Sequence, residues 1–175
     1  RMFGYATKLR THRIAVVVPC YQVEGQVRDV LAEIPGFVHV IIAIDDASSD
    51  NTGRILDEVS QHDDRLMVIH HHANQGVGGA VVTGYREVLR RDVDVVVKLD
   101  GDGQMDPSSI PFLVVPVLQG RAEYVKGNRF HQLSHALTMP PMRRLGNLGL
   151  SFLIKAASGY WNVFDPTNGY TAISA

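Results

Sequence analysis

The chain has 175 residues and a mass of 19.3 kDa, which suits one domain with a real hydrophobic core. Its 45% hydrophobic and 20% charged residues are ordinary for a globular protein and exclude wholesale disorder. The formal net charge of -1 excludes the overall basic field of a dedicated nucleic-acid binder.

The single cysteine, Cys20, excludes an intrachain disulfide and a cysteine-rich zinc site and fits a reducing cytosol. No partner base for a Cys20 nucleophile is identifiable, so a small core residue is the preferred interpretation. No apolar run reaches the ~18 residues of a membrane-spanning helix, and no secretory signal is visible. Because the chain starts at Arg1 and ends abruptly at Ala175, we expect a piece of a longer protein.

Short apolar runs alternate with amphipathic segments along the whole chain. In chain order the patterns predict a strand at 14–18, ended by Pro19, then a helix at 25–34, a strand at 38–44, a helix at 52–61 capped by Ser49 or Asp50, a strand at 66–70, a helix at 77–91, a strand at 93–99, a helix from Pro107, a strand at 122–127 and a helix at 145–158. This alternation predicts an α/β fold with a mainly parallel, Rossmann-like sheet covered by helices on both faces. Ligands of such sheets bind beyond the carboxyl ends of the strands.

Charge is unevenly distributed. The part before residue 126 is acidic, whereas the later part carries Lys126, Arg129, Arg143, Arg144 and Lys155 against Asp165 alone. The asymmetry suggests a metal-binding first half and an anion-binding second half. A solvated helix face is the alternative.

Two acidic motifs directly follow predicted strands. In the first, Asp45 and Asp46 precede Ala47-Ser48-Ser49-Asp50-Asn51-Thr52. A carboxylate there can accept hydrogen bonds from a base or a ribose. A turn rich in capping residues explains the later residues of the motif but not the adjacent Asp45 and Asp46, whose charges repel.

The second motif is Asp100-Gly101-Asp102-Gly103-Gln104-Met105-Asp106. Alternate carboxylates separated by small residues can point into one site, and Mg²⁺ is commonly held by one or two carboxylates plus substrate phosphates. A calcium loop is rejected, because its sixth and twelfth positions hold Met105 and Pro111 instead of Gly and Glu. A simple Gly/Asp turn stays open.

The glycine loop Asn74-Gln75-Gly76-Val77-Gly78-Gly79-Ala80 precedes a predicted helix and allows a nucleotide to approach the backbone. It is a weak signal alone, because Val81 stands where a dinucleotide fingerprint needs its third glycine, and tight helix packing explains it equally well. On a strand, His70 and His72 would share a face. Without clear further ligands, a metal role for the run His70–His72 is not favoured.

Taken together, five ordered segments resemble the family 2 glycosyltransferases of the GT-A fold. They are Pro19–Glu24, Asp45–Asp50, Asn74–Gly76, Asp100–Gln104 and Gly127–Arg129. The dolichyl-phosphate mannose synthase and polyprenyl-phosphate glycosyltransferase branch is the most similar. The resemblance implies an inverting, hexosyltransferase-type transfer from a nucleotide-diphosphate sugar, with Mg²⁺ or Mn²⁺, to a polyprenyl phosphate. It also implies one GT-A catalytic domain over 1–175, truncated at its C-terminus, with a nucleotide-binding half at 14–105 and an acceptor-side half at 106–175.

The resemblance assigns roles on the nucleotide side of the site. Pro19, Tyr21 and Glu24 would line the nucleotide pocket. Asp46 would contact the base, with Asp45 in support. The residues that would border the nucleoside are Asn74, Gly76 and Gly79.

On the diphosphate side, Asp100, Asp102 and Gln104 match the family's metal-binding pattern, with Asp102 as the direct ligand and Asp100 acting through water or ribose. Arg129 would neutralise the diphosphate, and Arg143 or Arg144 would serve the diphosphate or the acceptor phosphate.

Three features depart from the family pattern. Gln22 replaces the usual Asn after Tyr21, which is expected to alter a turn more than the chemistry. Thr171 stands where a basic residue is common after the segment that begins at Asp165. Finally, family members continue further, often into membrane-associated helices, so this piece is expected at the cytoplasmic face of a membrane only within the full-length protein.

The acceptor decides whether a general base is needed. A polyprenyl phosphate is already an anionic nucleophile, and the basic end of the chain suits it. A saccharide or protein hydroxyl needs a base, for which Asp165 is the candidate, unless it only shapes a turn before Pro166. The helix at 145–158 would lie at a membrane surface or in the core, and 130–142 would form a loop over the site.

Other classes of protein are also considered. A non-catalytic nucleotide-sugar-binding module is a further alternative, although the intact acidic set argues against it. A nucleotidyltransferase or a nicotinamide oxidoreductase is disfavoured, because this sequence lacks the glycine signature that each class carries after its first strand.

Overall fold

The computed structural model describes residues 9, 11–127 and 169–175. The chain divides into two compact units, Arg1–Val125 with Tyr170–Ala175, and Lys126–Gly169. The fold below is that of the first unit. The helix expected at 145–158 and the loop expected at 130–142 lie outside the described residues.

A six-stranded sheet with the order β3-β2-β1-β4-β6-β5 forms the centre of this unit. Strands β1 to β4 pair in parallel, and β6 pairs with β4 in the antiparallel direction, which confirms the mainly parallel sheet. The strands are β1 (Ile14–Cys20), β2 (Val40–Asp45), β3 (Leu66–His70), β4 (Val95–Lys98), β5 (Tyr124–Lys126) and β6 (Thr171–Ser174).

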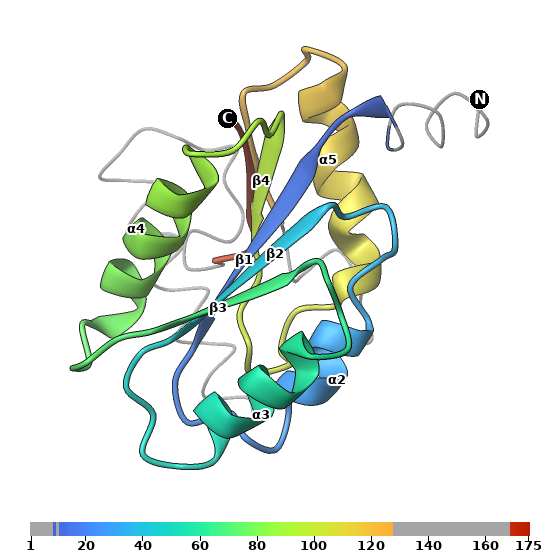
Figure 1. The fold of residues 1–175 in the computed structure, drawn as a ribbon. Helices are drawn as coiled ribbons and strands as arrows, with labels where there is room; N and C mark the ends of the chain where they lie inside the picture. The colour runs from blue at the N-terminus through green and yellow to red at the C-terminus, as the bar shows by residue number, and fades with distance from the viewer. Residues whose placement is uncertain (1–8, 10, 128–168) are drawn as a thin grey trace, which may run out of the picture. The chain divides into compact units, whose positions relative to one another are not determined.

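Helices cover both faces of the sheet, as the alternation predicts (Figure 1). One face carries α2 (Val27–Ala32), α3 (Thr52–Ser60) and α5 (Ile110–Leu118), the last preceded by the short 3-10 helix η1 (Pro107–Ser109). The other face carries α4 (Gly76–Val88), which packs on β1 and β2. The predicted boundaries agree to within a few residues.

Strand β1 is buried along its entire length, because both of its faces are covered by helices and both of its edges are paired. Val16 and Val18 belong to the core beneath α2, α3 and α5, whereas Ala15 and Val17 belong to the core beneath α4. A continuous run of β-branched residues is the expected sequence of such a central parallel strand.

The sequence-based prediction that Pro19 ends the first strand is wrong, because β1 continues to Cys20. The Pro19 carbonyl accepts a hydrogen bond from Gly101 N–H at 3.3 Å, on the side facing β4. Pairing between β1 and β4 stops at Lys98. Proline has no main-chain N–H, and at position 19 that N–H would face the residues after β4. No hydrogen bond between paired strands is therefore lost.

Strand β6 is not predicted from the sequence. It contains four residues, and only Ala172 and Ile173 are apolar, so neither alternation nor a long apolar run marks it. Its register places Thr171 directly opposite Lys98 of β4. The C-terminal residues therefore complete the sheet beside β4, at the same end as the acidic motif.

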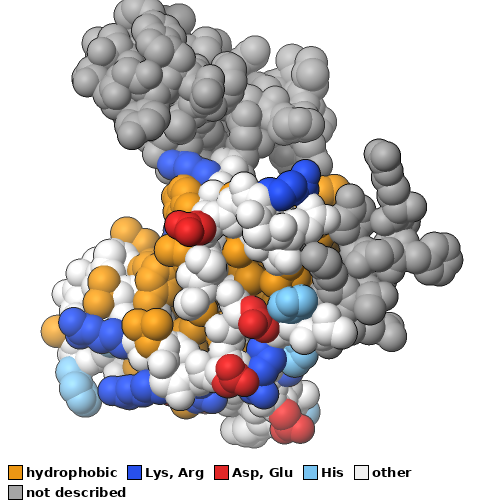
Figure 2. Space-filling model, turned by 90° about the horizontal axis from the view of Figure 1, so that it is seen from above, with side chains coloured by type: hydrophobic (Ala, Val, Ile, Leu, Met, Phe, Trp, Pro, Cys, Tyr) orange, Lys and Arg blue, Asp and Glu red, His pale blue; other side chains and the backbone are white. Residues whose placement is uncertain are grey.

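On the face shown in Figure 2, exposed hydrophobic side chains lie between charged ones. Among the described residues, Leu89, directly after α4, and Phe112 of α5 are the most exposed large hydrophobic side chains, at 74% and 79%. No helix within the described part of the chain has the length and apolar character needed to cross a membrane.

Close packing of α4 on the sheet gives a stability prediction. A Cβ at Gly84 would lie 2.3 Å from Val17 Cγ1 and 2.9 Å from Ile44 Cδ1, whereas one at Gly78 meets nothing within 4 Å. Gly84→Ala should therefore lower the free energy of unfolding by about 1–3 kcal/mol. Gly78→Ala should be neutral or raise it by up to about 1 kcal/mol, because alanine is the better helix former.

Urea denaturation of both variants measures these two free energies. An unchanged or more stable Gly84→Ala variant would contradict the tight contact between α4 and β1.

Candidate functional site

A cleft of about 510 Å³ lies at the carboxyl ends of the parallel strands. Its walls come from the end of β1, the residue after β2, the start of α4 and the loop after β4. Seven residues predicted from the sequence line it, namely Pro19, Tyr21, Asp46, Asn74, Gly76, Asp100 and Asp102. Motifs that are far apart in the chain therefore meet in one place, as the parallel topology requires.

The loops that follow β1 and β2 are joined by polar contacts. Glu24 Oε2 accepts hydrogen bonds from the main-chain and side-chain nitrogens of Asn51, both at 2.9 Å. In return, Asp50 Oδ2 accepts one from Glu24 N–H at 3.3 Å, and Asp50 Oδ1 accepts one from Thr52 N–H at 3.0 Å. The prediction that Ser49 or Asp50 is the cap of helix α3 is wrong, because the N-cap residue is Asn51, whose side chain makes no capping hydrogen bond. Asp50 precedes the cap and accepts a hydrogen bond from the first main-chain N–H of the helix. Glu24 supports the wall of the cleft without lining it.

Gln22 adopts a left-handed backbone conformation with φ of 52°. Asn tolerates this conformation better than Gln, so the departure from the family pattern does fall on a strained turn. Its N–H donates to Ser48 Oγ at 3.1 Å and its Nε2 donates to Ser49 Oγ at 2.9 Å. Gln22 therefore holds the same pair of loops together through its longer side chain.

Asp45 ends β2 and is buried below the cleft, outside its lining residues. Its Oδ1 accepts a hydrogen bond from Ser48 N–H at 3.0 Å, and its Oδ2 lies 3.1 Å from His70 Nδ1. A Cβ at Gly53 would come within 2.7 Å of Asp45 Oδ2, so glycine lets α3 approach this carboxylate. Asp45 shapes the turn that presents Asp46.

Asp46 lines the cleft with a carboxylate fixed by several donors. Its Oδ1 lies 2.7 Å from His71 Nδ1 and accepts a hydrogen bond from Gln75 N–H at 2.9 Å. Burial raises the pKa of the Asp46 carboxyl, but the hydrogen bonds from Gln75 and His71 outweigh it and hold that pKa below its ordinary value. The side chain is therefore an ionised hydrogen-bond acceptor.

His71 is buried behind Asp46, with its side chain 6% exposed. Its Nε2 lies 2.9 Å from Thr83 Oγ1 on α4. Because a carboxylate only accepts hydrogen bonds, Nδ1 carries the proton that faces Asp46. A chain of three side chains, from Thr83 through His71 to Asp46, thus connects α4 to the cleft.

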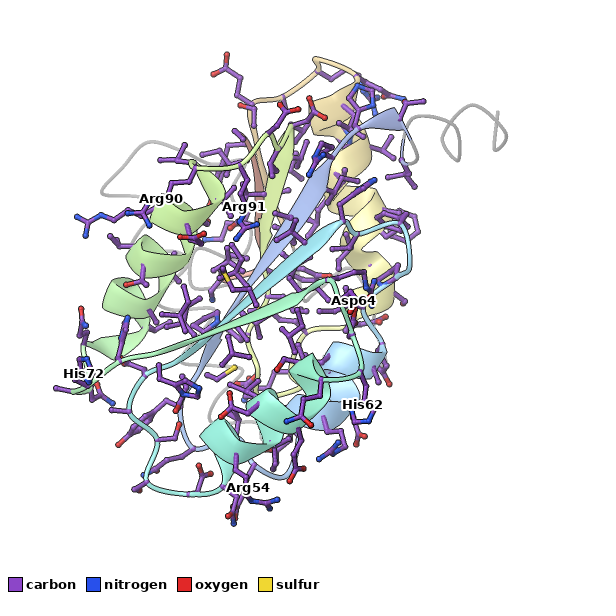
Figure 3. All side chains as sticks on the ribbon, viewed as in Figure 1. Arg54, His62, Asp64, His72, Arg90 and Arg91 are labelled. Carbon is purple, nitrogen blue, oxygen red and sulfur yellow. The ribbon has the colours of Figure 1, made fainter. Side chains whose placement is uncertain are left out.

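The neighbouring histidines lie elsewhere. Strand β3 ends at His70, so the strand alternation that would put His72 on the same face does not reach it. His72 points away from the sheet (Figure 3). His70 lies between Asp45 and Asp57 of α3, and its Nε2 is 3.0 Å from Asp57 Oδ1.

The glycine loop begins α4. Asn74 Oδ1 accepts a hydrogen bond from Gly76 N–H at 2.9 Å, and Gly76 has a φ of 75°, which suits glycine best. Gly79 does not line the cleft. A Cβ at this position would lie 2.5 Å from Gln75 Cβ, at the start of the helix. Gly76 thus exposes backbone to the cleft, whereas Gly79 gives room to Gln75.

The acidic loop after β4 forms the opposite wall. One carboxylate oxygen of Asp100 pairs with the ammonium of Lys98. Asp102 Oδ1 accepts a hydrogen bond from Gln104 N–H at 3.0 Å, across Gly103, whose φ is 74°. Gln104 is exposed, and it is not among the residues that line the cleft.

The donor set suits a hard divalent cation. Asp100 and Asp102 both line the cleft and supply carboxylate oxygens, which Mg²⁺ and Mn²⁺ prefer. Within the described residues, no group of three or more His, Cys, Asp or Glu side chains could hold a metal by itself. These residues fit a cation whose remaining ligands come from a bound diphosphate.

Cys20 lies on the floor of the cleft and is 1% exposed. Burial raises the pKa of its thiol, and the charges of Asp45 and Asp100 add to that effect. A Cβ at Gly101 would lie 2.9 Å from Cys20 Sγ, so the acidic loop packs directly on the sulfur. The interpretation of Cys20 as a small core residue is confirmed, because its side chain belongs to the buried hydrophobic core on the side of α2, α3 and α5.

Several contributors to the site were not singled out from the sequence. The cleft is also lined by small or apolar residues, Val23, Val77, Ala80 and Gly101. Lys98, His71 and Thr83 act behind it. No local motif marks Lys98 or Thr83, and the histidine run marks His71 only for a metal role that is not favoured. Arg129, Arg143, Arg144 and Asp165 lie outside the described residues, so their roles stay predictions.

The family model "Glycosyl transferase family 2" matches residues 15–175. The chain belongs to this glycosyltransferase family, and its fold is of the GT-A type.

Among similar curated proteins is the UDP-N-acetylglucosamine–dolichyl-phosphate N-acetylglucosaminyltransferase of Methanococcus voltae, 32% identical over 92% of this chain and 69% of that protein. The undecaprenyl-phosphate mannosyltransferase of Micrococcus luteus is 31% identical over 93% of this chain and 67% of that protein. Glucosyl-3-phosphoglycerate synthase from Mycobacterium tuberculosis, solved with Mn²⁺, UDP and glucosyl-3-phosphoglycerate, superposes with a TM-score of 0.71 and 21% identity. The match covers 99% of this chain and 61% of the solved chain.

The contacts of His70 predict a pH dependence of stability. The hydrogen bond to Asp57 raises the pKa of His70, burial opposes this, and Asp45 adds to the increase. The folded-state pKa therefore lies above the ordinary value of about 6.5, and the contribution to stability is full below that value and lost as the pH rises through the folded-state pKa. Asp57→Asn should destabilise the protein more at pH 5.5 than at pH 8.5, by less than about 1 kcal/mol, because the pair is partly exposed.

Urea denaturation of the wild type and Asp57→Asn at both pH values measures the difference, and NMR titration of the His70 ring measures its pKa directly. An equal cost of the substitution at both pH values would show that the pair does not form.

Proposed function

We propose that this protein transfers a sugar, with inversion at the anomeric carbon, from a nucleotide-diphosphate sugar to a polyprenyl phosphate, with the aid of a divalent cation. One observation carries the proposal: an acceptor suited to a base, Asp46, and an acidic pair suited to a metal, Asp100 and Asp102, line the same cleft. A nucleoside diphosphate joins these two chemistries in one molecule.

At the base end, the proposal relies on the ionised state of Asp46. An acceptor-only carboxylate pairs with a ring N–H, which both uracil and guanine offer. Gln75 N–H and His71 hold the carboxylate in place before the ligand arrives, so little conformational freedom is lost on binding. Tyr21, 48% exposed at the cleft, offers a flat surface on which a base can stack.

At the diphosphate end, Asp102 would hold a divalent cation with Asp100 beside it. A bound cation there would offset the negative charge that develops on the departing diphosphate. Arg129, and Arg143 or Arg144, are proposed to add positive charge to the diphosphate or to the acceptor phosphate.

The acceptor is proposed from two observations. Two similar proteins, at 32% and 31% identity over most of this chain, are named as a dolichyl-phosphate N-acetylglucosaminyltransferase and an undecaprenyl-phosphate mannosyltransferase. A phosphate acceptor is already an anion and attacks without a general base. The basic residues after position 125 favour such an acceptor and an anionic membrane surface, so we place the whole protein's reaction at the cytoplasmic face of a membrane.

We further propose that 14–105 form the nucleotide-binding half of one catalytic domain and that 106–175 form its acceptor side. The chain spans about two thirds of the length of these curated relatives, so the activity is proposed for the whole protein.

Replacing Asp102 tests the metal-dependent binding of a donor. Calorimetric titration should give Mn²⁺-dependent binding of either UDP or GDP to the wild type, weakened at least about tenfold by Asp102→Ala. Asp106→Ala is the matched control, because Asp106 belongs to the same loop but caps η1 through Ser108 N–H at 2.8 Å and does not line the cleft. Equal affinity in the wild type and Asp102→Ala would contradict the proposed metal site.

Replacing Asp46 tests the base end separately. Asp46→Asn keeps the shape of the side chain but removes its charge. It should therefore weaken the binding of UDP or GDP by about tenfold or more with Mn²⁺ held constant. Binding of inorganic pyrophosphate, which has no base, should not change. Asp64→Asn, which alters an exposed carboxylate outside the cleft, serves as the control in the same titration. A parallel loss of pyrophosphate binding in Asp46→Asn would argue against base recognition.

A further inference from the structure

Lys98 is a buried cation that the proposed function does not use. It is the last residue of β4 and only 8% exposed, after the three valines Val95, Val96 and Val97. Its ammonium pairs with Asp100, the first carboxylate of the acidic loop. Its neighbours in the sheet are Val17 on one side and Thr171 on the other. Lys98 does not line the cleft itself, and its link to the cleft is the contact of its ammonium with Asp100, which does.

Stability alone does not account for this residue. Taking an ammonium out of water is unfavourable, and a pair with one carboxylate offsets that cost only in part. An apolar residue in place of Lys98 would continue the run of three valines in β4. Asp100 would not be left buried without a partner, because its side chain is 26% exposed and contacts water. A cation at this position therefore points to an effect on the charges of the cleft.

The net charge at the diphosphate end of the cleft depends on Lys98. Asp100 and Asp102 alone would present two negative charges to a cation. With Lys98 paired to Asp100, the described residues at this end present one net negative charge, on Asp102. A divalent cation alone is then held weakly, whereas a cation that arrives with a diphosphate brings its own negative charge.

We propose that Lys98 is a positioning residue that occupies Asp100 in the empty cleft and thereby makes tight cation binding depend on the nucleoside diphosphate. The inference rests on the proposed function, because it assigns a regulator to that same site. A cation that arrives with the diphosphate would compete with Lys98 for Asp100, and Asp100 would then be available to the cation or to the ribose. The cation and the nucleotide would therefore bind cooperatively.

A double-mutant cycle on Lys98 and Asp100 tests the proposal. The affinity for Mn²⁺ alone is measured by electron paramagnetic resonance of free Mn²⁺. Lys98→Met should tighten Mn²⁺ binding without nucleotide by about tenfold, because it removes the competing cation. Asp100→Asn should weaken it by a similar factor, because Lys98 then faces Asp102. The double variant Lys98→Met/Asp100→Asn should return to the wild-type affinity, since its net charge at the site equals that of the wild type.

Arg65→Met is the matched control. Arg65 pairs with Asp63 before β3, at the amino end of the strands, so its loss removes the same charge far from the cleft. Its Mn²⁺ affinity should equal that of the wild type. Circular dichroism establishes that each variant is folded. If Lys98→Met does not fold, the difference between Asp100→Asn and the double variant still decides the question.

The outcomes separate this inference from the proposed function. Equal Mn²⁺ affinities across the cycle, together with Mn²⁺-dependent UDP or GDP binding by the wild type, would overturn the role of Lys98 and leave the donor site intact. A merely structural Lys98 would lower the melting temperature in Lys98→Met without tightening Mn²⁺ binding. Failure of the wild type to bind either diphosphate with Mn²⁺ would instead overturn the proposed function.

Discussion

The burial of β1 is the constraint on which the cleft depends. This strand is paired on both edges and covered on both faces, so it has no freedom to shift relative to β2 and β4. Its register with these neighbours, Cys20 opposite Asp45 and Val17 opposite Lys98, brings the ends of three strands to one level. The acidic loops begin where this apolar core ends, and their positions follow from packing that they do not take part in.

The carboxylates around the cleft are largely held by partner side chains. Asp46 faces His71, Asp45 faces His70, and Asp100 faces Lys98, in each case with one partner directly behind the cleft wall. Such pairs fix the direction of a carboxylate, whereas a lone exposed carboxylate would sample several rotamers. Asp102 differs, because its only described partner is the N–H of Gln104 two residues on, and this exposure suits a group that must accept a cation.

The sequence predicts the parallel core well because each central strand is a short β-branched run bounded by polar loops. It also identifies Asp46, Asp100 and Asp102, since strand ends converge in any parallel sheet. It does not identify Lys98, His71 or Thr83, because their roles come from register and helix packing, which no local pattern encodes. The strand at Thr171–Ser174 and the continuation of β1 through Pro19 likewise depend on where a neighbouring strand ends.

His71 follows β3 directly, and β3 is the outermost strand at its end of the described sheet. Outer strands open locally at a lower free energy than central ones. Each opening of β3 withdraws the imidazole that orients Asp46, although Asp46 itself follows a central strand. A molecule held by Asp46 therefore selects the closed form of β3, and slowed amide hydrogen exchange along that strand becomes the signature of an occupied cleft.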